Sequence, residues 1–79
     1  MMEQYRGFWI CGGAEGQNDS LLGHAFRWCP IGNIDYVRPS GSLVELTRFR
    51  LSKMTFDEEG IAELFGLELA RLLVDSCYR

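Results

Sequence analysis

The residue types best suited to chemistry in this sequence are one histidine, His24, and three cysteines, Cys11, Cys29 and Cys77. Imidazole and thiolate groups are common ligands of tetrahedral zinc, and a Cys-His pair can act as a nucleophile with its base. The four residues are widely spaced and include no Cys-x-x-Cys pair to organise a metal site. Nothing in the sequence marks a thiol as having the electropositive setting of a reactive thiolate. We therefore expect no metal, no cofactor and no catalytic residue, and keep an enzyme or metal protein as a third hypothesis.

Three glycines, Gly12, Gly13 and Gly16, follow a predicted strand. Phosphate-binding loops place such glycines between a strand and a helix. Here the residues that follow are rich in Gly, Asn, Asp and Ser, which indicates a connection rather than a helix. We interpret residues 12–23 as a long loop.

Basic and aromatic residues gather between residues 26 and 50. The candidates for a nucleic-acid face are Arg27, Trp28, Tyr36, Arg48 and Arg50. On one sheet face they could stack and neutralise a single strand. The competing interpretation is a solvated face whose arginines pair with acidic residues and cover the aromatic rings. The net charge of −3 favours neither nucleic acid nor an anionic membrane as a partner, so single-stranded nucleic-acid binding is the alternative hypothesis.

The size and composition of the chain restrict the fold that positions these groups. A chain of 79 residues holds one domain, spanning residues 1–79. Apolar residues make up 47% of the sequence, which indicates a packed globular domain rather than disorder. The N-terminal residues lack the features of a secretion signal, and the cysteine number is odd. We expect reduced cysteines and a cytoplasmic protein.

Aromatic and β-branched residues predict the strands. One strand is expected at about residues 5–11 and a hairpin at about residues 24–52, with its turn at Pro39-Ser40-Gly41. The return arm alternates Leu43, Phe49 and Leu51 on one side with arginines on the other. Val44 and Leu46 disturb that alternation.

The last third of the chain predicts one helix over about residues 56–77. Thr55 and Glu58 have the spacing of a capping box. The apolar side covers about two thirds of the helical circumference, which indicates either a curved sheet around the helix or two separate contacts. Small residues recur every four positions along its centre, at Ala62, Gly66 and Ala70, and predict a close approach to the sheet.

This helix pattern, Ala62-x-x-x-Gly66-x-x-x-Ala70-Arg71-x-x-Val74-Asp75, follows a strand pair divided by Pro39-Ser40-Gly41. In that respect the chain resembles a group of small uncharacterised bacterial proteins. The resemblance implies a short antiparallel sheet followed by one C-terminal helix, and it implies no activity.

The sequence therefore predicts an α+β fold, in which a three-stranded antiparallel sheet has one long C-terminal helix packed on one face. One helix cannot cover every aromatic side chain of such a sheet, so the remaining apolar surface favours an interface. Our first hypothesis is a cytoplasmic protein-interaction or regulatory module that binds a protein partner. We expect this partner to be a second copy of the chain, in a symmetric dimer. The open sheet face and the helix flank are the candidate surfaces, and Trp28, Leu67 and Val74 are the candidate contacts.

Overall fold

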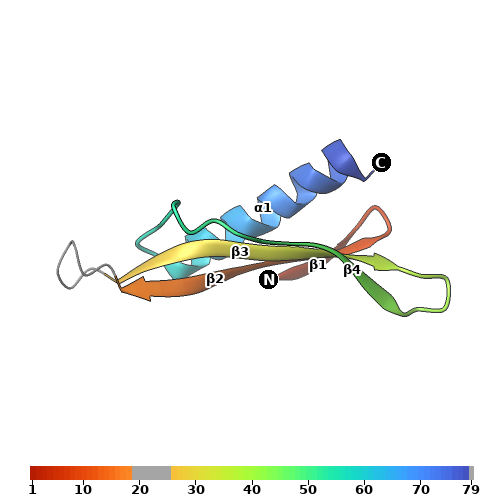
Figure 1. Cartoon of the computed structure of the whole chain (residues 1–79), viewed down its shortest axis with the longest axis horizontal. Helices are drawn as coiled ribbons and strands as arrows, with labels where there is room; N and C mark the ends of the chain where they lie inside the picture. The colour runs from red at the N-terminus through yellow and green to blue at the C-terminus, as the bar shows by residue number, and fades with distance from the viewer. Residues whose placement is uncertain (19–25, 79) are drawn as a thin grey trace.

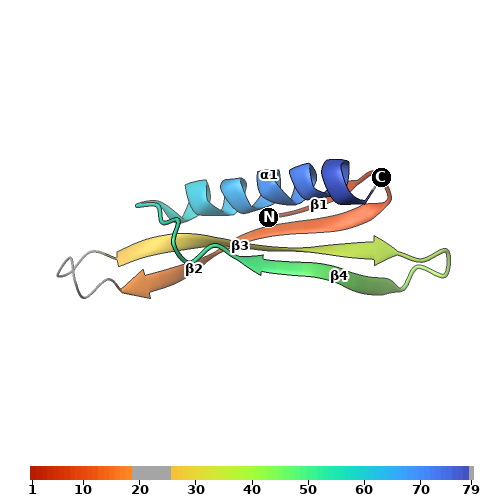
Figure 2. The same ribbon diagram turned by 45° about the horizontal axis from the view of Figure 1, so that its top comes forward.

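The computed structural model describes residues 1–18 and 26–78, which form an antiparallel sheet and one C-terminal helix. The elements are β1 (Met2–Tyr5), β2 (Phe8–Asn18), β3 (Phe26–Val37), β4 (Leu43–Arg50) and α1 (Glu59–Cys77). The strands lie side by side in chain order, and α1 covers one face of the sheet along β2 and β3 (Figures 1 and 2). The predicted α+β architecture is confirmed, with four strands in place of three.

The additional strand comes from a tight hairpin at the N-terminus. The strand expected at about residues 5–11 is divided by a two-residue turn, and β1 pairs with β2 from Met2 opposite Cys11 to Tyr5 opposite Phe8. Both turn residues have positive φ, 53° at Arg6 and 86° at Gly7, as a hairpin turn that matches the sheet twist requires. Arginine rarely adopts this conformation, so only Gly7 carries the usual sequence signal of such a turn.

The predicted loop at residues 12–23 is wrong for its first part. Residues 12–18 belong to β2, which pairs with β3 along its whole length, whereas residues 19–23 lie outside the described residues. Gly12 serves packing rather than a turn, because a Cβ atom on it would lie closer than 3.0 Å to the backbone of Glu63 and Leu67 in α1. The glycine-rich stretch is therefore the place where β2 lies directly beneath the helix.

The hairpin expected at about residues 24–52 is present as β3 and β4, but α1 starts later than predicted. It begins at Glu59, and its N-cap residue Glu58 makes no side-chain cap hydrogen bond. The capping box is therefore absent. Phe56 instead exchanges two backbone hydrogen bonds with Trp28, of 2.8 and 2.9 Å, and the Thr55 hydroxyl accepts a hydrogen bond from Arg27.

The core lies between α1 and the middle strands. Its buried members are Ile10, Ile34, Leu67, Ala70 and Val74. The small residues at the centre of the helix are buried as predicted, and at Gly66 a Cβ atom would lie closer than 3.0 Å to the carbonyl oxygen of Ile31. Backbone-to-backbone packing of this kind fixes the height of the helix above the sheet.

Candidate interaction surfaces

The side of α1 that faces away from the sheet is largely apolar. It carries Ile61, Leu64, Phe65 and Leu72, whose exposed fractions are 48%, 48%, 37% and 60%. We call these four residues the outer stripe. An ordinary surface helix is polar on this side. The sheet therefore satisfies only the inner part of the broad apolar arc, and it does not wrap around the helix (Figure 2).

Two of the predicted contact residues are not at the surface. Leu67 and Val74 are only 4% and 1% exposed and pack in the core, so they cannot contact a partner while the domain is folded. The apolar pattern revealed two flanks of the helix, but it did not show which flank the sheet covers. Trp28, the third candidate, is partly buried next to the Phe56 bridge.

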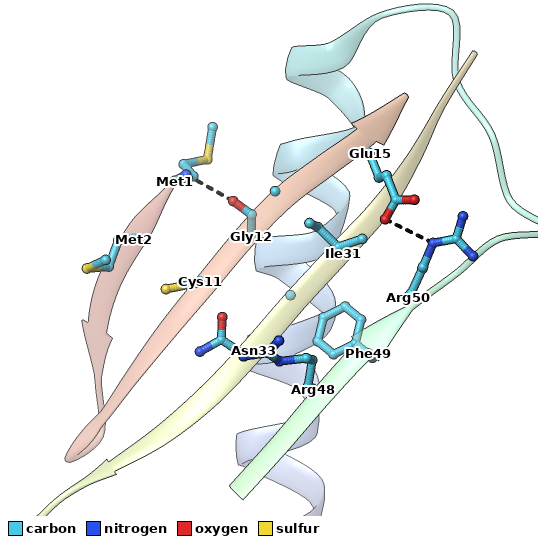
Figure 3. A pocket seen from close by; sticks show the side chains of 12 residues that line it. Met1, Met2, Cys11, Gly12, Glu15, Ile31, Asn33, Arg48, Phe49 and Arg50 are labelled. Carbon is cyan, nitrogen blue, oxygen red and sulfur yellow. Dashed lines mark hydrogen bonds and ion pairs between the residues drawn. The ribbon is translucent and has the colours of Figure 1, made fainter. Parts of the chain in front are cut away.

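The sheet face opposite α1 contains a hollow of about 490 Å³. Figure 3 shows it in front of the sheet, with the helix behind, and with Met2, Cys11, Ile31, Asn33 and Arg48 around it. Its floor is largely backbone, because Gly13 has no side chain on this face, while side chains at Gly12 and Gly32 would point to the helix side. The hollow is therefore a recess between cross-strand side chains on an otherwise uncovered sheet face.

The surroundings of Cys11, which lines this hollow, do not favour a reactive thiol. Burial raises the pKa of the Cys11 thiol, and the nearby carboxylate of Asp35 raises it further. A thiol in this setting stays protonated at neutral pH and is a poor nucleophile or metal ligand. Within residues 1–18 and 26–78, no group of three or more His, Cys, Asp or Glu side chains could hold a metal ion. His24 lies outside the described residues.

The arginines of the predicted nucleic-acid face are paired with acidic residues. Arg27 lies 2.5 Å from Asp57, Arg48 lies 2.7 Å from Glu45, and Arg50 lies 3.0 Å from Glu15. The hydrogen bond with Glu15 raises the pKa of the Arg50 guanidinium above its ordinary value. These pairs match the solvated sheet face that was the competing interpretation.

Tyr36 lies on the other face of the sheet from Arg48 and Arg50. Its ring packs at 6.0 Å from that of Phe8, which in turn lies 5.9 Å from the ring of Tyr78, beyond the end of the helix. The described residues therefore do not bring the predicted aromatic and basic residues together on one surface.

The strand β4 contains a β-bulge that the sequence did not predict. Thr47 and Phe49 lie on the helix side, since Thr47 hydrogen-bonds the Tyr78 hydroxyl and Phe49 packs against the core. Val44 lies on that side too, opposite Tyr36. The spacing is therefore three residues and then two, as expected from the register shift opposite Ile34 and Asp35.

This bulge corrects the predicted alternation and explains why Val44 and Leu46 disturbed it. Leu43 and Phe49 lie on opposite faces, not together. Glu45 and Arg48 share the open face and form an ion pair, which an i, i+3 pair on a regular strand would not do.

No family model, curated protein or solved structure matches this chain. The structure does contain an antiparallel sheet followed by one C-terminal helix, the architecture expected from the sequence. No helix in the described part of the chain is long and apolar enough to cross a membrane.

Proposed function

We propose that this protein is a small protein-interaction module that assembles with a second copy of itself. The observation that supports the proposal is the amount of large apolar surface left exposed on a two-layer fold. The outer stripe is one part of it, and Leu43 and Leu46 on the edge strand β4, 53% and 41% exposed, are another. Contiguous exposed apolar surface is typical of binding sites.

Packing inside the domain accounts only for part of the stripe, since the ring of Phe65 lies 5.5 Å from that of Phe56, whereas Ile61, Leu64 and Leu72 remain 48% or more exposed. The outer stripe points away from the sheet, and β4 lies at the edge of that sheet. Their exposure costs free energy in an isolated chain and is relieved when a partner covers them. The three cysteines are free, which supports the cytoplasm as the compartment of this module.

The test is the mass in solution, measured by light scattering after size exclusion, with reductant and over a range of protein concentrations. We expect a mass that rises with concentration towards twice the 9.0 kDa of the chain. A mass that stays at 9.0 kDa up to the highest concentration would overturn self-association.

Single-stranded nucleic-acid binding is the alternative, and the ion pairs of Arg48 and Arg50 weigh against it. Binding of a fluorescent oligonucleotide that falls steeply with salt, and that is lost in the Arg48→Glu/Arg50→Glu variant, would favour it. Without such binding the interaction module stands alone.

A further inference from the structure

The outer edge of β4 is free of backbone partners within the described residues. β4 is the last strand of the sheet and bonds only to β3 on its inner side. It has eight residues, half of them apolar, and neither proline nor lysine. Long exposed edges usually carry protection against pairing with other strands. Here that protection consists of the bulge and of the charges of Glu45, Arg48 and Arg50, so only a strand that matches both can pair with this edge.

The backbone groups that point outward from this edge can be identified from the bonds at its two ends. Leu51 donates its N–H to Pro30, and Ser42 accepts at its carbonyl from Arg38, both at 2.9 Å. These residues face inward, and bonding direction alternates along an antiparallel strand on each side of the bulge. The outward-facing residues of β4 are therefore Leu43, Glu45, Arg48 and Arg50.

The bulge gives this outward ladder an unusual spacing of two, three and two residues. A regular strand presents outward groups at every second residue, so it could match only one half of the edge. A second copy of β4 running antiparallel has the same spacing in reverse and matches all four positions. The geometry of the edge thus favours the chain itself over an arbitrary extended peptide.

Only one register aligns all four outward residues, and it also aligns opposite charges. Glu45 then lies opposite Arg48 of the second copy, and Arg48 lies opposite its Glu45. Their side chains share the open face of the sheet, as directly opposed residues do. The neighbouring registers with an outward pair at the two-fold axis would oppose Glu45 to Glu45 or Arg48 to Arg48, and like charges in that position are destabilising.

The same register also covers apolar surface. On the helix side it sets Val44 opposite Phe49 of the second copy, and both are only partly buried in one chain. It brings Leu46 towards the two-fold axis and sets Leu43 against the aliphatic part of the Arg50 side chain of the second copy. The helix does not obstruct the approach, because α1 packs over β2 and β3 (Figure 1).

We propose that two copies of this protein join through their β4 edges, antiparallel about a two-fold axis centred between residues 46 and 47, into one continuous eight-stranded sheet. This inference rests on the proposed self-association and names its contact surface. The two-fold axis closes the assembly, whereas pairing of β4 with the short β1 edge of another copy would continue into a filament.

Charge reversal tests the register directly. Glu45→Arg and Arg48→Glu each place like charges opposite one another twice across the axis, so each variant alone should dimerise roughly tenfold or more weakly than the wild type. An equimolar mixture places arginines opposite glutamates at all four positions, and its dissociation constant should return to near the wild-type value. Sedimentation velocity over a concentration series measures the dissociation constants of the two variants and of their mixture.

Two controls separate this surface from others. Glu59→Arg changes the charge by the same amount as Glu45→Arg, at an exposed residue at the start of α1 and away from β4, and should leave dimerisation unchanged. Leu72→Glu in the outer stripe, compared with Gly60→Glu on the same helix, reports on a helix-mediated contact. Circular dichroism confirms that each variant is folded.

The outcomes distinguish the two proposals. A mixture of the two reversed chains that associates no better than either alone would overturn the β4 pairing. Dimerisation that survives both reversals but is lost in Leu72→Glu would also overturn it, while leaving self-association intact. A wild type that stays monomeric throughout would overturn both, and masses that keep growing would indicate filaments instead of a closed pair.

Discussion

Replacing Gly66 by alanine should destabilise the protein although alanine is the better helix former. Gly66 lies in the middle of α1, where its Cα faces the backbone of β2 and β3. An added Cβ would lie closer than 3.0 Å to the carbonyl oxygen of Ile31 and 3.4 Å from that of Gly13. Backbone atoms cannot rotate away, so the helix must lift from the sheet.

The expected loss of stability in Gly66→Ala is the difference between two opposing effects. Alanine gains about 1 kcal/mol of helix propensity over glycine. Overpacking a filled core typically costs about 1 to 3 kcal/mol, and a clash with the backbone belongs at the upper end of that range. We expect a net loss of about 2 kcal/mol in the free energy of unfolding, which for a domain of this size lowers the Tm by roughly 10 °C.

Gly60 provides the matched control, because it lies in the same helix and a Cβ there would meet nothing within 4 Å. Gly60→Ala should stabilise the protein by about 0.5 to 1 kcal/mol. Both variants are compared by urea unfolding followed by tryptophan fluorescence, at one low protein concentration so that association contributes equally. If Gly66→Ala proves as stable as the wild type or more so, the close approach of helix and sheet is refuted.

Three further predictions concern single contacts. Tyr5→Phe removes hydrogen bonds of 2.9 and 3.0 Å to the carboxylate of Asp75 and should lower the free energy of unfolding by about 1 kcal/mol; an unchanged urea midpoint would contradict this. The hydrogen bond from Arg71 lowers the pKa of Glu3, so its stabilisation is full above the unfolded value and is lost as the pH falls through the folded one. The difference in urea midpoint between the wild type and Glu3→Gln should therefore shrink below about pH 4.3, and a difference independent of pH would argue against this pair. Cys29 is fully buried, so iodoacetamide should label it only after unfolding, long after the exposed cysteine near the end of α1; equal labelling by peptide mass spectrometry would disprove its burial.

Much of the architecture could be predicted because it depends on local patterns. The seam of Ala62, Gly66 and Ala70 repeats every four residues, and this periodicity alone placed it on one face of a helix. Alternating apolar residues and the turn at Pro39 and Gly41 likewise indicated an antiparallel hairpin.

The strand status of residues 12–18 could not be found in the same way. Glycine at these positions favours a loop when only chain neighbours are considered. Its actual role is to let Gly12 pass beneath Glu63 and Leu67 of α1, residues about fifty positions away in the chain. A signal of that kind exists only once the helix is docked.

The residues of the candidate surfaces could likewise be predicted only in part. The sequence revealed that the helix is apolar on more than one flank, and therefore that some apolar side chains would remain exposed. It could not tell that Leu67 and Val74 are buried while Leu72 is exposed, because both flanks satisfy the helical period equally well.

The sequence by itself thus determined the α+β class, the C-terminal helix and its small-residue seam, since periodicity and turn chemistry are properties of neighbouring residues. Only the tertiary structure decided which flank of α1 faces the sheet, that Glu45 and Arg48 share a face across the β4 bulge, and that the outward edge of β4 has a spacing that a second copy can match. Each of these depends on the register between segments far apart in the chain, which is fixed by packing and by backbone hydrogen bonds.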